Sequence, residues 1–204
     1  MMRTDETPKV PKIELWPGAV VPYQIEVAED CGELQQAIDR YQELGTFKFI
    51  LRSRDSEYEF PDYLRFVTGK RNFSYIGKAG GAQEVQLVPG FTTGNALHEI
   101  GHALGRVHEH CRSDRDEYVT IRWENIDRHA IVEFTRHWMG PAELGPYNLE
   151  SIMHYSKLNF TKNGSRTCEP KEAARNGLLM GQRKQLSDLD AVAFGKLYEQ
   201  EVQR

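Results

Sequence analysis

The segment HEIGHALGRVHEH, residues 98–110, contains four of the seven histidines of the chain. Residues four apart on an α-helix lie one turn above each other, so His98 and His102 would project from the same face. If the helix ends at Gly105, where glycine accepts a left-handed backbone turn, His108 can reach the same metal ion. Three neutral imidazoles leave a fourth position open for water, which is typical of catalytic rather than structural zinc.

Glu99, directly after the first histidine, would lie beside the metal rather than on it. Zinc lowers the pKa of its bound water to about 7, and a glutamate in this place can take the water proton and deliver it to a leaving amine. An isolated HExxH also occurs in ordinary helices. Here five positions fit the metal-site pattern, namely His98, Glu99, His102, Gly105 and His108, and all five would arise by chance in roughly one in 10⁵ chains of this length. The pattern therefore predicts hydrolysis through a zinc-bound water activated by Glu99, and we interpret His110, His129 and His137 as solvated or structural.

The spacing of apolar residues predicts the elements that would hold this motif. A helix is expected from Gly94 or Asn95 to Gly105, capped by Thr92 or Thr93. Upstream, we expect a mixed sheet with a helix packed on it, formed by strands over 20–27, 46–53, 72–77 and 84–89 and a helix over 31–45. Downstream, we expect a helix near 124–138, a loop-rich region over 139–185 and a final helix that starts near a Ser187 cap.

Length, charge and hydropathy bound the class of protein. A chain of 204 residues suits one globular domain, with room for two lobes around a cleft. The formal net charge is 26 − 30 = −4 and no basic block dominates, which argues against a nucleic-acid partner. No run approaches the roughly 18 apolar residues of a membrane helix, and the polar start MMRTDETPKVPKIE lacks the apolar centre of a secretory signal. Residues 1–12, with prolines at 8 and 11, are expected to form a flexible leader.

The sequence resembles a known family. HEIGHALGRVH fits the zinc-binding consensus of the metzincin metalloproteases, and Glu109 directly after the third histidine is typical of the astacin branch. Other blocks are similar to astacins in the same order: LWPGAVVPYQI to the start of the mature domain, HEHCRSDRDEYVTIRWENI to the segment after the zinc motif, SIMHY to the Met-turn and MGQRKQLSDLDAVAFGKLY to the C-terminal helix region. The resemblance implies a zinc metalloendopeptidase with one catalytic Zn²⁺.

The resemblance also implies an α+β fold, the two-lobed, zincin-like catalytic domain of metzincins. Such a domain has an N-terminal mixed twisted sheet with two long helices, a loop-rich C-terminal lobe with a C-terminal helix, and an active-site cleft between the lobes. Residues 1–12 would then be a leader or propeptide remnant, and residues 13–204 the peptidase domain. Its lobes would cover about 13–107 and about 108–204.

Four residues outside the histidine triad gain roles from the resemblance. Met153 would form a hydrophobic floor beneath the zinc site, and Tyr155 would be an additional zinc ligand that swings away and donates to the oxyanion. His154 between them is interpreted as structural. Glu109 would contact the mature N-terminus, which the resemblance puts near Glu6–Lys9.

The expected partner is a protein or peptide substrate. The strand QEVQLVP, 83–89, is similar to the family's edge strand, to which an extended peptide adds by backbone hydrogen bonds. Arg183 matches a position where some astacins place a basic side chain, which would favour an acidic residue after the cut; an ordinary surface arginine is the alternative. We expect a monomer, secreted to the extracellular space by family resemblance.

The cysteines depart from the family pattern. Astacins usually carry two disulfides in this domain, but the cysteines expected in the TFKFIL strand, at the place of Phe91 and after the final KLY are absent, whereas Cys31, Cys111 and Cys168 stand elsewhere. A Cys111–Cys168 disulfide remains an open alternative, as does a thiol of Cys31 or Cys111 that ligates zinc in a latent form. For at least Cys31, we favour a small buried or semi-buried thiol.

Two other interpretations of the whole chain compete with an astacin-like protease. A catalytically silent binding protein of the same fold is disfavoured because Glu99 is present. Another metzincin subfamily, such as matrixin or serralysin, is disfavoured by Glu109 and Tyr155.

Overall fold

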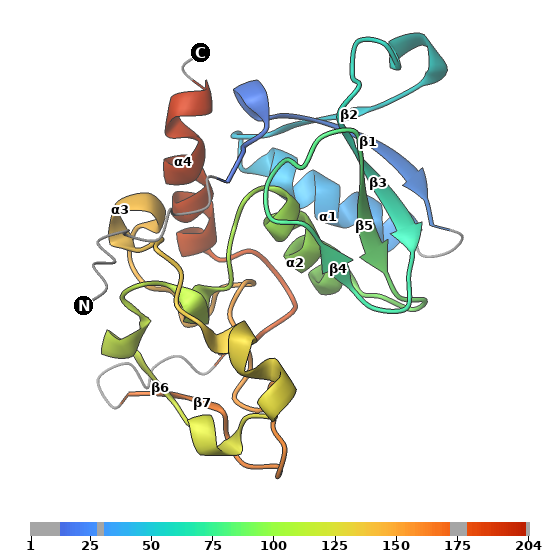
Figure 1. Cartoon of the computed structure of the whole chain (residues 1–204). Coiled ribbons are helices and arrows are strands. Elements are labelled where there is room, and N and C mark those ends of the chain that lie inside the picture. Colours follow the sequence, from blue (N-terminus) through green and yellow to red (C-terminus); the bar gives the residue numbers. More distant parts are fainter. Residues whose placement is uncertain (1–12, 28–30, 172–178, 203–204) are drawn as a thin grey trace, which may run out of the picture.

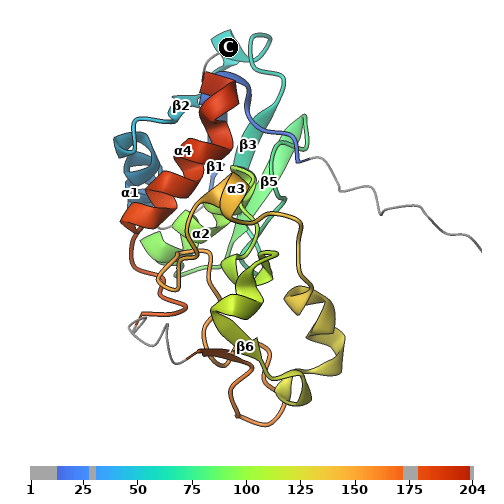
Figure 2. The ribbon, with the colours of Figure 1, turned by 90° about the vertical axis from the view of Figure 1, so that its left-hand side faces the viewer.

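The computed structural model describes residues 13–27, 31–171 and 179–202. Figures 1 and 2 show two regions: one holds the main sheet with helices α1, α2 and α4, and the other consists mainly of loops, short helical turns and the strands β6 and β7. The leader expected over residues 1–12 lies outside the described residues. Within the described ranges, no helix has the length and apolar character needed to cross a membrane.

The first region is built on one five-stranded mixed sheet, as expected. Its strands lie in the order β2-β1-β3-β5-β4. The first four of these are parallel to their neighbours, and only β4 runs antiparallel, to β5. Their bounds are β1 Val20–Glu26, β2 Lys48–Leu51, β3 Tyr63–Thr68, β4 Phe73–Ser74 and β5 Ala82–Leu87.

Strand β3 was missed by the sequence analysis. Leu64 and Phe66 are fully buried, whereas the residues between and beside them are only half-buried, which is the alternation of a strand with one face on the core. Only two strongly apolar positions carry this signal, and charged residues at 52, 54, 55, 57, 59, 62 and 65 obscure it. The strand forms because β1 and β5 pair with it on both sides, and that pairing is not encoded locally.

The expectation that residues 83–89 form an edge strand was wrong. Residues 83–87 belong to β5, which pairs with β3 along its whole length and with β4 through Val85 and Gln86. The outermost strand on this side of the sheet is β4, Phe73–Ser74. A substrate that adds to the sheet here would therefore meet β4.

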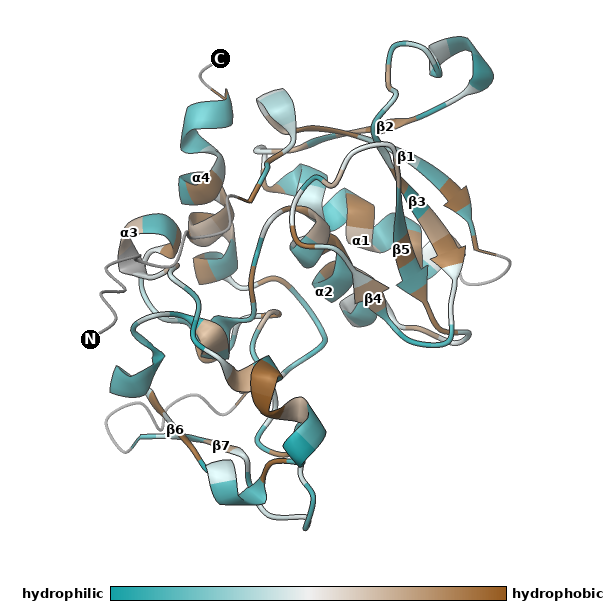
Figure 3. Cartoon of the chain, viewed as in Figure 1, coloured by the Kyte–Doolittle hydropathy of each residue, from teal (hydrophilic) through white to brown (hydrophobic). Residues whose placement is uncertain are grey.

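The three long helices confirm the sequence-based expectations. They are α1 Cys31–Glu43, α2 Thr93–Ala103 and α4 Asp188–Val202. Gly45 follows α1 in the left-handed region with φ 72°, and the Ser187 hydroxyl accepts the Asp190 N–H at 3.1 Å to cap α4. Polar and apolar bands alternate along α1 in Figure 3, and its inward positions join the core.

Helix α4 completes the core of the first region although it is the last element of the chain. Phe194 packs edge-on against Tyr41 of α1, with ring centroids 5.2 Å apart, and Tyr198 packs against Phe47 at 4.8 Å. Tyr41 in turn donates its hydroxyl hydrogen to the Leu97 carbonyl of α2 at 2.7 Å. The C-terminal helix therefore packs on the core of the first region, and it also contacts the second region, where its Ala193 clusters with Met139 and Leu144.

The second region contains little regular structure among its described residues. Strands β6 Val119–Ile121 and β7 Cys168–Pro170 form an antiparallel pair, and α3 Pro141–Leu144 is one short turn. Neither strand was predicted, since three residues give too short a pattern. A small core lies here, made of Val119, Ile121, Ile126, Ala130, Phe134, Tyr147, Tyr155, Cys168 and Met180.

The helix expected near 124–138 is replaced by two 3₁₀ segments, Trp123–Asn125 and Arg128–Phe134. Ile126 between them is extended, with φ −80° and ψ 139°, because it forms a bridge with Thr161. The Asp127 N–H also donates to the Phe160 carbonyl at 2.9 Å. These non-local backbone bonds interrupt a segment whose local pattern suits an α-helix.

Candidate metal centre

Helix α2 and the turn after it bring the histidines of residues 98–110 together. Thr92 caps the helix: its side chain accepts the Asn95 N–H, and the Asn95 side chain accepts the Thr92 N–H in return. Beyond the helix, Gly105 has φ 95°, a conformation that residues with a Cβ rarely adopt, and a Cβ there would meet Leu15 Cδ2 at 2.7 Å. The chain thus turns back at Gly105 and carries His108 towards α2, as the sequence predicted.

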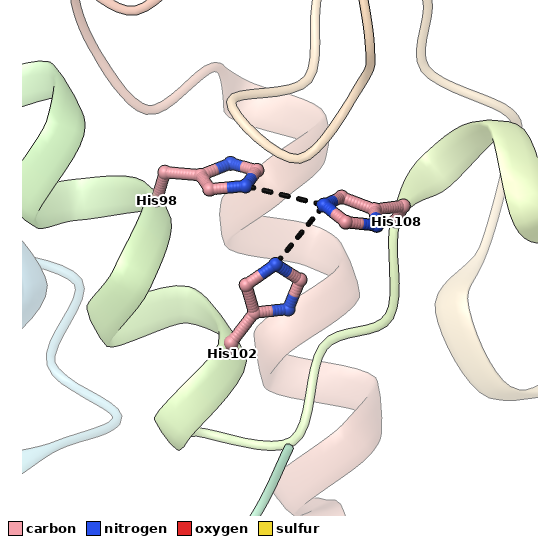
Figure 4. A group of neighbouring side chains, drawn as sticks. All are labelled: His98, His102 and His108. Atoms are coloured by element: carbon pink, nitrogen blue, oxygen red, sulfur yellow. Dashed lines mark hydrogen bonds between the residues drawn. The ribbon is translucent and has the colours of Figure 1, made fainter. Parts of the chain in front are cut away.

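The side chains of His98, His102 and His108 converge through their Nε2 atoms (Figure 4). His108 Nε2 lies 3.1 Å from His102 Nε2 and 3.3 Å from His98 Nε2. Nitrogens bound to one tetrahedral zinc ion at about 2.0–2.1 Å lie about 3.3–3.4 Å apart, so the triad fits such an ion. Among the described residues, these three histidines are the group whose ligand atoms lie within 4.8 Å of one another.

Backbone carbonyls fix the orientation of two of these rings. Nδ1 of His98 lies 2.8 Å from the Ile152 carbonyl, and Nδ1 of His102 lies 2.8 Å from the Arg106 carbonyl. A carbonyl can only accept, so each Nδ1 carries the proton and each Nε2 presents a lone pair to the centre. Burial, followed by the charge of His102, holds the pKa of His98 well below its ordinary value, and burial lowers the pKa of His102 to about 4. Both rings are therefore neutral at pH 7, as metal ligands must be.

Glu99 shares a pocket of about 680 Å³ with the triad. Its side chain is 6% exposed, and burial raises the pKa of its carboxyl to about 7, an effect that the positive charge of Arg183 partly offsets. The carboxylate is not one of the converging ligands. The site thus combines a metal-binding triad with a carboxyl group that can exchange a proton near neutral pH.

Met153 packs against α2 at Gly101, between His98 and His102. It is fully buried, and a Cβ added at Gly101 of α2 would meet its Sδ at 2.5 Å, so glycine is needed for this close approach. Asp190 of α4 holds the turn: it accepts from the Ser151 hydroxyl at 2.5 Å and from the Ile152 N–H at 3.0 Å. The helix that completes the core therefore also positions the carbonyl that orients His98.

Tyr155 lies beside the triad. Its ring centroid is 4.3 Å from that of His108, and it stacks on His110 at 4.0 Å. Glu133 lines the same pocket, and burial, reinforced by the negative charge of Glu133, raises the pKa of Tyr155 above its ordinary value. Its role as a metal ligand stays a prediction. Sequence analysis gave no role to Glu133, and no local pattern marks it because it reaches the site from the 3₁₀ segment Arg128–Phe134.

Glu109 is enclosed by two arginines that the sequence analysis did not consider. Arg106 Nη2 donates to its carboxylate at 2.8 Å and Arg112 Nη1 at 2.9 Å, and all three side chains are at most 1% exposed. The Asn148 N–H adds a further bond at 2.9 Å. The expected contact with a mature N-terminus near Glu6–Lys9 falls outside the described residues. Arginines three positions before and after Glu109 were the visible sequence signal for this network.

All three cysteines are free thiols, so the alternative of a Cys111–Cys168 disulfide was wrong. Cys111 and Cys168 are buried, and burial raises the pKa of each thiol to about 12. Cys31 is exposed, so the expectation of a buried or semi-buried thiol there was wrong. Cys111 instead donates to the Glu133 carbonyl at 3.2 Å. Neither Cys31 nor Cys111 belongs to the metal-binding group among the described residues.

Arg183 lines the same pocket as Glu99. Its Nη1 donates to the carbonyls of His154 at 3.0 Å and Gln182 at 2.8 Å, which hold the side chain in place. Its backbone carbonyl lies against the start of α2, where a Cβ at Gly94 would be only 1.7 Å away. The sequence left open whether this residue is an ordinary surface arginine, and the structure brings it into the cleft.

His154 is structural, as expected, and it makes the fold sensitive to acid. It is fully buried; its Nδ1 faces the Tyr155 carbonyl at 2.7 Å, its Nε2 lies 2.9 Å from the Tyr147 hydroxyl, and burial lowers its pKa to about 4. Because the folded state binds this proton less tightly than the unfolded chain does, the free energy of unfolding should fall as pH drops below 6.5. We expect His154 to contribute about 2 kcal/mol of this loss between pH 7.5 and 5.

Urea unfolding at both pH values would measure this contribution. The His154→Gln variant should show a smaller pH dependence than the wild type, whereas His129→Gln, at an exposed position, should match the wild type. An equal loss of stability in wild type and His154→Gln would contradict the assignment.

Comparison with known proteins gives concordant matches. The family model for Astacin, a family of peptidases, matches residues 9–199. The zinc metalloproteinases nas-14 and nas-6 of Caenorhabditis elegans are 36% and 35% identical over 91% and 90% of the chain, which spans 37% and 53% of their own lengths. Among solved structures, high choriolytic enzyme 1, a hatching enzyme zinc-protease from the medaka fish Oryzias latipes, matches with a TM-score of 0.79 and 29% identity, covering 97% of this chain and 98% of that one.

Proposed function

This chain belongs to the astacin family of zinc metalloproteinases, and from that premise we propose that it is an endopeptidase that cuts internal peptide bonds with one catalytic zinc ion. The observation that carries this proposal is the convergence of three Nε2 atoms, 3.1–3.3 Å apart along His102–His108–His98, beside a buried carboxyl group in one pocket. The curated relatives are longer than the matched region, so the activity of the whole protein is inferred from this domain.

His98, His102 and His108 would hold the zinc ion, which supplies Lewis-acid chemistry by acidifying water and polarising a carbonyl oxygen. Glu99 takes the proton of the attacking water and passes it to the leaving amine. A carboxyl group whose pKa burial has raised to about 7 suits both halves of that transfer near neutral pH. The carbonyls of Ile152 and Arg106 hold the rings of His98 and His102 with Nε2 directed at the metal position during this transfer.

Tyr155 is the second candidate for a direct catalytic role. Its ring borders His108, and burial raises its pKa, so the phenol keeps its proton at neutral pH and acts as a donor. We infer that the hydroxyl donates to the oxygen of the scissile carbonyl as negative charge develops there.

The substrate would lie extended in the cleft, next to strand β4. Phe73 and Ser74 of this outermost strand line the same pocket as the triad, together with Arg71 and Ile76 from its flanks. An extended peptide can add to an exposed sheet edge by backbone hydrogen bonds, with alternate side chains directed into pockets. β4 thus takes the place that the sequence analysis gave to residues 83–89.

Cleavage of an unfolded protein, with the cut sites mapped by mass spectrometry, tests the proposal. An endopeptidase should produce internal cuts that grow with time. Binding of the unfolded protein without any new termini would instead favour a catalytically silent protein of the same fold. Release of single residues from one end would contradict endopeptidase action.

The same cut-site map tests the role of Arg183. Arg183 and Arg71 both line the pocket and give it positive charge. We therefore expect enrichment of the acidic residues Asp or Glu directly after the cut. Arg183→Ala should reduce that enrichment roughly tenfold, by removing one charge-assisted contact. Lys184→Ala, at an exposed neighbouring position, should keep it. Acidic enrichment that survives in Arg183→Ala would refute the assignment.

Family membership also supports an extracellular site of action and a monomer, both of which stay proposals. Fractionation of cells that express the full-length protein, and gel filtration with light scattering, would test them.

A further inference from the structure

We call the pocket of about 680 Å³ that the histidine triad and Glu99 line the zinc cleft. A second pocket, of about 520 Å³, adjoins it in the second region of the fold. We call it the basic pocket. Thr135, directly after the 3₁₀ segment Arg128–Phe134, lines both the basic pocket and the zinc cleft. The other lining residues are Arg115, Asp116, Val119, Thr120, Ile121, Trp123, Arg136 and Lys171.

The charges of the basic pocket are predominantly positive. Three cations and one anion line it, a formal sum of 3 − 1 = +2. The anion, Asp116, is already bound: Arg115 Nε donates to it at 2.9 Å and Arg136 Nη1 at 3.1 Å, while Lys171 Nζ donates to its backbone carbonyl. Arg115 is nearly buried, whereas the side chain of Arg136 is 55% exposed and Lys171 is exposed as well. Arg136 and Lys171 therefore remain available to an anionic ligand.

The walls of the basic pocket suit a polypeptide. All three residues of β6 line it, and among the described residues β6 pairs with β7 on one side alone, so its other edge can receive an extended chain. Trp123 adds an aromatic surface and is 46% exposed. The Arg115 guanidinium lies over its ring, with Cζ 5.7 Å from the ring centroid. Polar, apolar and cationic surfaces thus lie next to one another.

We propose that the basic pocket is an exosite that binds an acidic segment of the protein substrate while the scissile bond lies in the zinc cleft. Because Thr135 lines both pockets, they are neighbours, and an extended chain in the zinc cleft can continue towards the basic pocket. The inference rests on the proposed endopeptidase function and deepens it, because it names the substrate class: proteins that carry a run of Asp and Glu at a distance from the cut. Positive charge so placed also accelerates encounter with such substrates.

Peptide kinetics can test the exosite. A neutral peptide that contains one mapped cut site is compared with two extended forms, which carry a block of glutamates joined by a Gly-Ser spacer to either the N-terminal or the C-terminal end. For one of the extended forms we expect kcat/KM to rise roughly tenfold over the neutral peptide, mainly through a lower KM. The gain should shrink as salt is raised, because partly exposed charges are screened.

Substitutions identify the pocket. In Arg136→Ala/Lys171→Ala the ratio of kcat/KM between the extended and neutral peptides should fall to about one. The matched control is Lys162→Ala/Arg166→Ala, which removes the same two charge types from exposed positions of the same region that line neither pocket. This control should keep the wild-type ratio. Circular dichroism of both variants would confirm that each is folded.

A binding measurement gives a readout independent of turnover. A free glutamate block added to the wild-type protein should change the tryptophan fluorescence, and Trp123→Phe should remove that change. Trp16 is buried in the first region and should not respond, and Trp138, which is 39% exposed but does not line the basic pocket, is the matched control: Trp138→Phe should keep the change.

The outcomes separate the two proposals. If no peptide is cut, the proposed function fails, whatever the pocket binds. If the neutral peptide is cut and neither extended form is cut faster, the exosite is refuted and the endopeptidase stands. The exosite is also refuted if the extended peptide keeps its higher kcat/KM in Arg136→Ala/Lys171→Ala. It is refuted as well if the pocket binds a sulfated polysaccharide and not the glutamate block.

Discussion

Replacing Glu99 by glutamine is expected to lower kcat roughly 10²- to 10⁴-fold while the zinc ion stays bound. Glutamine keeps the size and one oxygen of the side chain but cannot take a proton from water. Because the Glu99 carboxylate is not among the converging ligands, the three histidines should bind metal as before. Loss of turnover with metal retained is thus the signature of a proton carrier.

The measurement pairs steady-state cleavage of an unfolded protein with metal analysis of the same sample. Glu59→Gln, at an exposed position between β2 and β3, is the matched control and should keep both rate and metal. A wild-type rate in Glu99→Gln would refute the role of Glu99. Loss of zinc in Glu99→Gln would instead make it a metal-site residue.

Removal of zinc should lower activity at least roughly 10³-fold, because Lewis-acid stabilisation of several kcal/mol is lost. A chelator should abolish cleavage by the wild type, and added zinc should restore it. In His102→Ala, one of three ligands is missing, so added zinc should restore little. His102 also donates from Nδ1 to the Arg106 carbonyl, and the variant needs a check of folding by circular dichroism.

Thermal unfolding supplies the second readout. A ligand that binds only the folded state raises its stability, by about 2.7 kcal/mol at a hundredfold excess over Kd. Zinc should therefore raise the melting temperature of the metal-free wild type and of His129→Ala, an exposed-histidine control, but not that of His102→Ala. One zinc per chain retained by His102→Ala with full activity would contradict the assignment of the triad.

The zinc triad could be predicted from the sequence because its geometry is local. His98 and His102 are one helical turn apart, and a single glycine brings back His108 within six residues of His102. Helix periodicity and the restriction on positive φ are properties of short segments, so the residue types themselves encode the arrangement.

The surroundings of the triad could not be predicted, because they depend on contacts between residues that are far apart in the sequence. Glu133, 22 positions before Tyr155, contributes to the raised pKa of that residue, and Asp190 accepts from the Ile152 N–H across 38 positions. Strand β3 has a weak local pattern and depends on partners on both sides. The second region has short strands and 3₁₀ turns held by isolated long-range backbone bonds. The basic pocket lies in this region, and its cations come from three separated segments that no spacing rule connects.

Helix α4 has a consequence for the order in which the chain can fold. During synthesis the sheet, α1 and α2 emerge first, but Phe194 and Tyr198, which pack against Tyr41 and Phe47, arrive with the last segment. Until then the apolar side of this core stays open, and the Met-turn lacks Asp190. A nascent chain that ends at residue 107 would therefore carry all the zinc-binding residues except His108 on an unfinished core. The protein should therefore gain its metal-binding shape only after α4 has left the ribosome and packed against Tyr41 and Phe47.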